Sequence, residues 1–217
     1  MHRFLTRIIG EQLEQPPDVA DLSLLGLPEE TKGWPLPENA PNQGPVPPGL
    51  VDWFAAGAGM LESQFRGSDP DEQVWTWSRS QTVGFWARMQ AIEAAVHRWD
   101  AERAVGAAQP VEANLAADAV GQTFEVMAPM RRAQAQAPPG RGERFRFRRT
   151  DGGQTWTVHF DREDVQLLEP AADCDVEMAG TASDLMLFLW QRIPADHLDV
   201  KGDMTVLDRY FTLMPPL

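Results

Sequence analysis

The sequence predicts an α+β protein, in which a helical N-terminal half precedes a smaller half that combines helices with a mainly antiparallel sheet. Apolar residues recur at steps of three and four over 83–103, which indicates an amphipathic helix. Residues 144–149 and 156–160 instead alternate between apolar and polar, which indicates a β-hairpin. We place the domain boundary after residue 105, so that 1–105 form the helical domain and 106–217 the α+β domain.

The composition favours a globular protein of a reducing compartment. Of 217 residues, 43% are apolar, which is enough for a buried core. Lys and Arg number 19 against 32 Asp and Glu, and the resulting net charge of -13 repels nucleic acids and anionic membranes. Cys174 is the single cysteine, so no internal disulfide is expected, in agreement with a cytoplasmic location. We therefore expect neither a nucleic-acid partner nor a membrane partner.

The first half contains two helices separated by a long irregular segment. Residues 1–15 carry helical apolar spacing and are followed by Pro16 and Pro17, which stop a helix. Residues 16–49 are rich in Pro, Gly and acidic side chains and predict a covering loop. Helical spacing returns over 50–66 and ends at Gly67. Its predicted buried face consists of Trp53, Phe54, Ala58, Leu61 and Phe65.

The helix expected over 83–103 carries two neighbouring stripes. One is apolar and consists of Phe85, Met89, Ile92, Val96 and Trp99. The other consists of Glu93, His97 and Asp100, whose spacing places them within about 60° of one another on the helix surface. Polar groups at the edge of a buried face need a partner, and Glu and His are ordinary ligands of zinc and similar ions. The alternative is that these three side chains only satisfy one another. Trp75 and Trp77 should cover the start of this helix.

The second half begins with a helix over 111–127 and a mobile connection over 130–142. The hairpin follows, with Phe145 and Phe147 facing inward. Further strands are expected over 165–168 and 174–178, which makes Cys174 a small core residue and not a nucleophile. Thr181 can cap the next helix, a last strand contains Leu198 and Val200, and a final helix begins at Asp203.

The hairpin also presents a row of cations on its other face. Arg144, Arg146 and Arg148 alternate with the two phenylalanines. They could contact an anionic ligand or form a solvated face, and the pattern leaves both open.

Several segments resemble one known family. They are the E-x-x-x-H-R-W-D motif at 93–100, T-V-G-F-W-A-R at 82–88, W-T-W-S at 75–78, A-S-D-L at 182–185, and the segments 187–192 and 200–209. Together they resemble the actinobacterial maleylpyruvate isomerase family of mycothiol-dependent enzymes. The resemblance implies a DinB-like up-down four-helix bundle, followed by a sterol-carrier-protein-like domain.

The resemblance also implies a site and a chemistry. By this resemblance, Glu93 and His97 correspond to ligands of a divalent metal, usually zinc. Asp100 and Arg192 correspond to catalytic positions, and the guanidinium of Arg192 would suit a substrate carboxylate. Mycothiol would be the thiol cosubstrate, added or transferred to a small electrophile, with cis-trans isomerisation of an unsaturated keto acid as one candidate reaction. The implied partners are a small-molecule electrophile and a low-molecular-weight thiol. A monomer or a homodimer is expected.

The N-terminus departs from the family pattern. Relatives supply a further metal-binding His from a segment resembling A-H-L-x-x-V-H-R-W, and Met1-His2-Arg3-Phe4 resembles only its end. That His would precede residue 1, the bundle would be incomplete, and His2 lies about 140° around the helix from the missing position. We therefore expect Met1 to be an internal start of a longer protein. The alternative function is a catalytically inactive relative or a shortened product with a structural or binding role.

Overall fold

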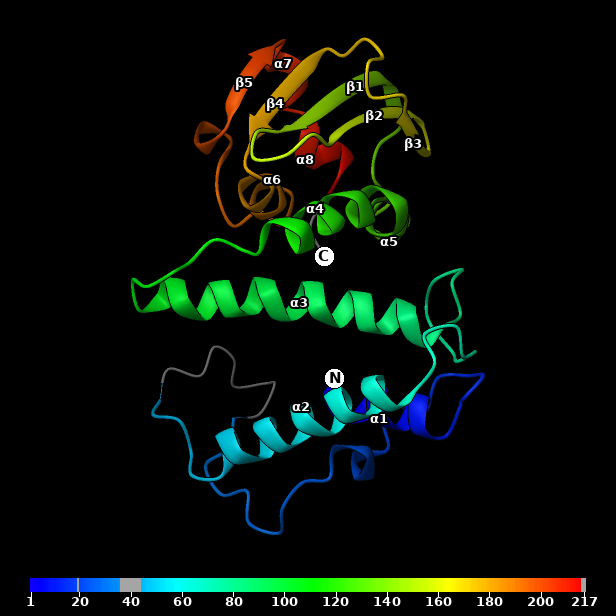
Figure 1. Cartoon of the computed structure of the whole chain (residues 1–217), viewed down its shortest axis with the longest axis vertical. Coiled ribbons are helices and arrows are strands. Elements are labelled where there is room, and N and C mark those ends of the chain that lie inside the picture. Colours follow the sequence, from blue (N-terminus) through cyan, green and yellow to red (C-terminus); the bar gives the residue numbers. More distant parts are fainter. Residues whose placement is uncertain (19, 36–43, 216–217) are drawn as a thin grey trace. The chain divides into compact units, whose positions relative to one another are not determined.

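The computed structural model describes residues 1–18, 20–35 and 44–215. It contains helices in the N-terminal part and a five-stranded, mostly antiparallel sheet in the C-terminal part, which confirms the expected α+β class (Figure 1). Contacts divide the chain into two compact units, Met1–Gln90 and Ala91–Leu217. The boundary after residue 105 stays a prediction. Among the described residues, no helix combines the length and the apolar character needed to cross a membrane.

The first unit is built on the pairing of α1 (His2–Gly10) with α2 (Leu50–Gly67). Helix α1 is shorter than expected, because the chain leaves helical geometry at Glu11 and Gln12, well before the two prolines. Leu5, Ile8 and Ile9 are its buried residues. The apolar spacing was therefore correct, but its last member, Leu13, lies beyond the end of the helix.

The buried face of α2 differs from the predicted one. Leu61 is buried as expected, but Phe54 is 57% exposed, and Gly57 lies inside instead. The reason is Arg3, whose guanidinium packs so close to Gly57 that a methyl group there would collide with it. The same guanidinium donates to the carbonyl of Trp53 at 3.0 Å and lies 4.5 Å from the Trp53 ring centroid.

The segment between α1 and α2 is irregular apart from one 3-10 turn, η1 (Leu22–Leu25). Residues 19 and 36–43 of this expected loop lie outside the described residues. Trp53 Nε1 donates to the carbonyl oxygens of Leu25 at 3.0 Å and Gly26 at 3.1 Å. The loop is thus fastened to α2 by hydrogen bonds from the Trp53 indole to the loop backbone, whereas the Leu22 side chain is largely exposed.

Helix α3 (Val83–Ala104) confirms the central prediction, because all five residues of its apolar stripe are buried. Aromatic side chains cover its first turns, as expected. Trp86 Nε1 donates to the Trp75 carbonyl at 2.8 Å, and Trp77 packs edge-on against Phe85 with centroids 5.0 Å apart.

The second unit contains a sheet of strand order β3-β2-β1-β4-β5. The hairpin is confirmed: β1 (Gly140–Arg149) pairs antiparallel with β2 (Thr155–Arg162). Strands β3 (Asp164–Leu168) and β5 (Asp199–Gly202) pair antiparallel at the two edges, whereas β4 (Val176–Gly180) pairs parallel with β1. The expected strand over 174–178 begins two residues later, so Cys174 lies before it and is only partly buried.

Helices pack on the inner face of this sheet, where Phe145, Phe147 and Phe160 are fully buried (Figure 1). In chain order the helical elements are α4 (Ala113–Gln122), the π-helical turn η3 (Thr123–Met127), α5 (Ala128–Gln134), α6 (Ala182–Leu189), η4 (Ala195–His197), α7 (Met204–Leu207) and α8 (Tyr210–Leu213). Thr181 caps α6 as predicted, whereas the expected final helix is divided into α7 and α8.

The expected mobile connection over 130–142 is wrong. Residues up to Gln134 form α5, and β1 begins at Gly140. The connection is fixed by Arg132, which donates to the carbonyls of Leu213 at 2.5 Å, Pro138 at 3.1 Å and Arg162 at 2.8 Å. Two arginines in this segment, Arg131 and Arg132, are buried, which their composition alone did not indicate.

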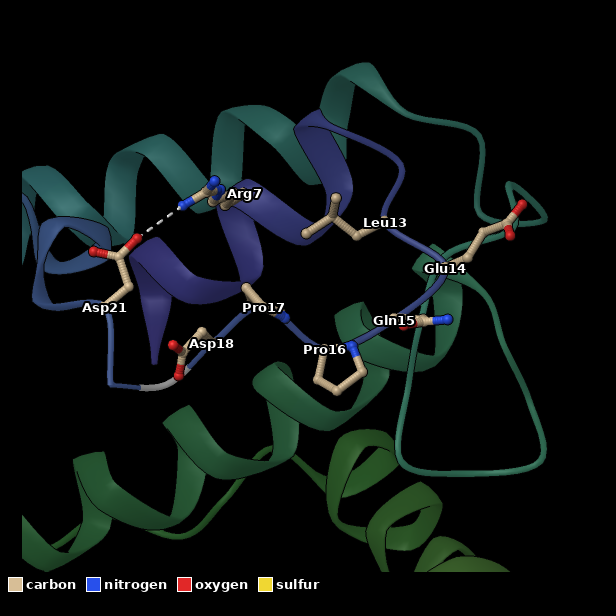
Figure 2. A pocket seen from close by; sticks show the side chains of 8 residues that line it. All are labelled: Arg7, Leu13, Glu14, Gln15, Pro16, Pro17, Asp18 and Asp21. Carbon is tan, nitrogen blue, oxygen red and sulfur yellow. Dashed lines mark ion pairs between the residues drawn. The ribbon is translucent and has the colours of Figure 1, made fainter.

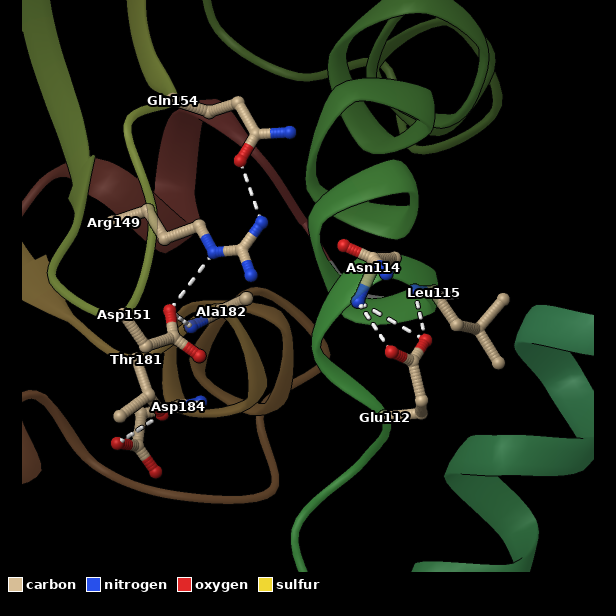
Figure 3. Close-up of polar contacts among 9 residues, drawn as sticks. All are labelled: Glu112, Asn114, Leu115, Arg149, Asp151, Gln154, Thr181, Ala182 and Asp184. Atoms are coloured by element: carbon tan, nitrogen blue, oxygen red, sulfur yellow. Dashed lines mark hydrogen bonds and ion pairs between the residues drawn. The ribbon is translucent and has the colours of Figure 1, made fainter.

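A polar cluster fastens the hairpin turn to the start of α6 (Figure 3). Arg149 is only 8% exposed and donates to Asp151 at 2.9 Å and Gln154 at 2.6 Å. Asp151 also accepts from the Ala182 backbone N–H at 3.0 Å. The pKa of Asp151 is lowered, because the bonds from Arg149 and Ala182 outweigh the opposing effect of burial. This cluster joins β1 to α6, which leads to the site described below.

The outer face of the hairpin is less exposed than a solvated face. Arg146 and Arg148 both pair with Glu177 of β4, at 3.2 and 3.0 Å. Arg146 also donates to the carbonyl of Ala172, in the segment before β4. These two arginines therefore share a single carboxylate, and an anionic ligand on this face stays a prediction.

Candidate functional site

Glu93, His97 and Asp100 form a connected row along α3, and all three belong to the second unit. His97 Nε2 lies 3.3 Å from Glu93 Oε2, and His97 Nδ1 lies 3.3 Å from Asp100 Oδ2. The imidazole thus stands between two carboxylates, one for each ring nitrogen. Its side chain is 64% exposed, so it is open to a ligand from solvent.

Arg192 joins this row from the end of α6. The helix ends at Leu189 with Trp190 as its C-cap, Gln191 adopts a φ of 57°, and the Arg192 N–H donates to the Leu187 carbonyl at 2.8 Å. This left-handed turn directs the guanidinium to Asp100, with Nε to Oδ1 at 3.0 Å and Nη2 to Oδ2 at 2.8 Å. The remaining Nη1 donates to the Trp190 carbonyl. Four residues selected from the sequence therefore lie together.

The ion pair sets the charge of Asp100. The hydrogen bond from Arg192 is the main cause that lowers the pKa of Asp100, with a smaller contribution from the His97 bond and an opposing one from burial. In return, the bond from Asp100 raises the pKa of Arg192. Asp100 is consequently a carboxylate near neutral pH, and it can accept the Nδ1–H of His97.

The row fits part of a zinc site. Tetrahedral zinc with bonds of about 2.0–2.1 Å separates neighbouring ligand atoms by roughly 3.3 Å, and Nε2 of His97 and Oε2 of Glu93 are 3.3 Å apart. A His ligand also commonly donates its other ring N–H to a carboxylate, the place that Asp100 occupies. Within residues 1–18, 20–35 and 44–215, no group of three or more His, Cys, Asp and Glu side chains is arranged to hold a metal. The row therefore contains two side chains, His97 and Glu93, at a spacing that zinc ligands adopt.

Arg131 of α5 is a neighbour that the sequence patterns missed. It is 6% exposed, and its guanidinium carbon lies 5.4 Å from the centroid of the Trp190 ring. Its charge interacts with Glu93, Arg192 and Tyr210. The sequence predicts a mobile connection here, whereas Arg131 lies in α5. The available indication was Pro129, which is tolerated in the first turn of a helix and stands at that position in α5.

Other candidate features of the described residues lie apart from this row. Burial raises the pKa of the Cys174 thiol, so it is not an activated nucleophile. A groove of about 520 Å³ in the first unit is lined by Arg7, Asp21 and the segment 13–18, and Figure 2 shows the ion pair of Arg7 with Asp21 at 3.7 Å. Glu93, His97, Asp100 and Arg192 are absent from its lining.

Solved structures similar to this chain include two proteins of the sterol-carrier type. A ubiquinone synthesis protein described as UbiJ-SCP2 is 19% identical, with a TM-score of 0.31, and sterol carrier protein 2 from Yarrowia lipolytica is 14% identical, with a TM-score of 0.28. Each match covers 44% of this chain and 91% of the other. These scores describe a loose likeness. No curated protein matches the chain.

Two family models account for most of the sequence. Residues 2–102 match the mycothiol maleylpyruvate isomerase N-terminal domain, and residues 114–209 match the C-terminal domain of the same family. The first match contains Glu93, His97 and Asp100, and the second contains Arg192. The chain belongs to the mycothiol maleylpyruvate isomerase family.

Proposed function

We propose that this protein is a divalent-metal-binding, mycothiol-dependent enzyme that adds a low-molecular-weight thiol to a small electrophile, or transfers the thiol onto it. The observation that carries the proposal is the row Glu93, His97, Asp100 and Arg192, in which each member is held by the next. Family membership supports the choice of mycothiol, which the description of the N-terminal family model names.

His97 Nε2 and Glu93 would hold the metal, which we propose to be zinc, and other groups would complete its coordination. When bound, such an ion lowers the pKa of a thiol, so that the thiolate is present at neutral pH. The chain's own residues prepare this position. In the tautomer that carries its proton on Nδ1, His97 donates to Asp100, and the Nε2 lone pair is then available on the side of Glu93.

Arg192 acts in this proposal through Asp100. Two of its three nitrogens bind the carboxylate and the third binds the Trp190 carbonyl, so the guanidinium is already engaged. It keeps Asp100 ionised and fixes its plane, because a guanidinium and a carboxylate match in a two-bond geometry. Asp100 and Arg192 are therefore positioning residues, which changes the role expected for Arg192 as a direct contact to substrate.

A second candidate is a non-catalytic relative with a structural or binding role. The observation that favours it is that His97 already lies 3.3 Å from both carboxylates, so the three side chains can satisfy one another without a metal. Under this reading, substitutions in the row change stability alone. A cytoplasmic location and a monomeric or homodimeric state are proposed under either candidate.

The deciding experiment is the metal content of the chain, purified without chelator, beside His97→Ala. His197→Ala is the matched control, because His197 is an exposed histidine of the same unit. Near-stoichiometric zinc in the wild type and the control, lost in His97→Ala, supports the enzyme, and a thiol-transfer assay with mycothiol follows. No metal in any of the three proteins, even after incubation with zinc, favours the second candidate.

A further inference from the structure

Six buried side-chain donors of the second unit lack hydrogen-bond partners among the described residues, and three of them are Nε atoms of Arg132, Arg144 and Arg146. The other three are Nε of Arg131, Nε1 of Trp190 and the hydroxyl of Tyr210. Tyr210 is fully buried, whereas Arg131 and Trp190 keep 6% and 7% of their surface exposed. A buried donor without a partner is costly, so three such groups in one region require an explanation.

The three groups lie close to one another and to the row on α3. Arg131 stacks over the Trp190 ring at 5.4 Å and lies within electrostatic range of the Tyr210 phenol. Glu93 and Arg192 act on Arg131 as well. The phenol ring of Tyr210 packs against Phe145 and Phe188, with centroids 5.0 and 5.7 Å away. The donors thus border an aromatic interior near Glu93.

The chemistry of these groups defines what is missing. Arg and Trp side chains can only donate, and a Tyr hydroxyl can donate, so the missing partner is an acceptor. Water could satisfy the donors but would place no anion directly against Arg131, on which the charge of Glu93 already acts. The other buried arginines of this unit differ. Arg149 pairs with Asp151, and Arg132 donates to three carbonyls.

We propose that Arg131, together with Trp190 and Tyr210, binds a small carboxylate, and that this carboxylate belongs to the electrophilic substrate. The second half of this proposal rests on the function proposed above. A carboxylate supplies negative charge and two acceptor oxygens in the plane that a guanidinium fork matches. Arg192, bound by Asp100, is not available for this purpose. Arg131 is buried, and its Nε has no hydrogen-bond partner among the described residues.

The test measures binding of succinate by isothermal titration calorimetry to full-length protein stripped of metal with 1,10-phenanthroline, a chelator that carries no carboxylate. Succinamide serves as the uncharged comparison. Arg131→Met removes the charge but keeps an apolar stem of similar length. The control is Arg148→Met, which removes a cation of the same unit that is already paired with Glu177.

We expect succinate to bind the wild type and Arg148→Met with similar affinity. Its affinity for Arg131→Met should be lower by a factor of about ten or more. Succinamide should bind all three weakly. Absence of succinate binding to the wild type, or equal binding to Arg131→Met, overturns the proposal. If Arg131→Met does not fold, Arg131→Lys and Tyr210→Phe replace it, and succinate affinity unchanged in both would be equally decisive against the site.

Because the titration uses metal-free protein, its result is independent of the zinc measurement. Succinate binding without zinc uptake would retain the carboxylate site and reject the proposed enzyme. Zinc uptake without succinate binding would retain the enzyme and reject Arg131 as the carboxylate ligand.

Discussion

Arg192 binds Asp100 through two parallel hydrogen bonds of 3.0 and 2.8 Å, although the two residues are 92 positions apart in the chain. Asp100 Oδ2 is also the atom that lies 3.3 Å from Nδ1 of His97. The orientation of an imidazole on α3 therefore depends on how α6 ends. Three residues of the row lie in the segment 93–100 and the fourth, Arg192, lies in the segment 187–192. Folding brings the two segments together.

Arg192→Met should weaken zinc binding by about 10–100-fold while the fold is retained, because Asp100 would lose the group that fixes its plane and His97 would lose its orientation. Competition with a metal-sensitive dye measures this affinity. Arg66→Met is the control, since Arg66 forms an exposed ion pair with Glu62 in the first unit. An unchanged zinc affinity in Arg192→Met would show that Asp100 does not orient His97.

Glu177 should make stability depend on pH. Its hydrogen bond with Arg148 is the main cause that lowers its pKa in the folded protein, with a smaller contribution from Arg146. A carboxyl whose folded pKa is lowered stabilises the fold above its unfolded pKa of about 4.3 and loses this contribution as the pH falls through the folded value.

Glu177→Gln should therefore lower the free energy of unfolding at pH 7 by up to about 1 kcal/mol, since the pair is partly exposed. Urea unfolding at pH 7 and pH 3 measures the difference between variant and wild type, which should shrink at pH 3. A difference of equal size at both values would mean that Glu177 acts through packing instead of charge.

Gly152→Ala should destabilise the second unit by about 1–3 kcal/mol, because the added methyl would lie 2.5 Å from Nε of Arg149 and displace it from Asp151 (Figure 3). Gly153→Ala is the matched control, since nothing lies within 4 Å of its added carbon. Chemical unfolding of both variants decides. Equal unfolding free energies of the two variants would indicate that Arg149 can move away from Gly152 without loss of stability.

Thr181→Ala should cost about 1 kcal/mol of unfolding free energy, because Thr181 Oγ1 accepts the Asp184 N–H at 3.1 Å at the start of α6. Thr181→Ser keeps the hydroxyl and should retain most of the stability. If the serine variant loses as much as the alanine variant, the methyl group and not the cap is responsible.

Trp53→Phe should release the loop before α2, because the indole N–H that binds the carbonyls of Leu25 and Gly26 is removed. We expect faster proteolytic cleavage within residues 20–35, with little change in overall helicity. Mass spectrometry of the fragments over time measures the cleavage rate. Trp34→Phe is the comparison, since its indole binds only the exposed carbonyl of Pro48. Equal cleavage rates for Trp53→Phe and the wild type would contradict this role.

Local periodicity of apolar residues was sufficient to predict the helices and strands that bury one continuous face. The stripe from Phe85 to Trp99 predicted α3, and the alternation around Phe145 and Phe147 predicted the hairpin. The same helical periodicity predicted that Glu93, His97 and Asp100 lie side by side, because spacing along a helix fixes which residues share a face. The resemblance of short motifs then identified the family, which the domain matches confirm.

Contacts with residues distant in the sequence decided which individual side chains are buried. Phe54 was expected inside α2, but Arg3 packs on Gly57 and leaves Phe54 exposed. Arg131 was assigned to a mobile segment because charge and proline favour loops, whereas a stacked Trp190 ring holds it inside.

The sequence by itself therefore determined the α+β class, the family and three residues of the row on α3. Tertiary structure alone decided that Arg192 binds Asp100 and that Arg131 is buried near Glu93, with an Nε that has no hydrogen-bond partner among the described residues. The physical reason is the range of the interactions. A helical stripe is set by bonds within a few residues, whereas burial of a charge depends on side chains that distant segments bring together.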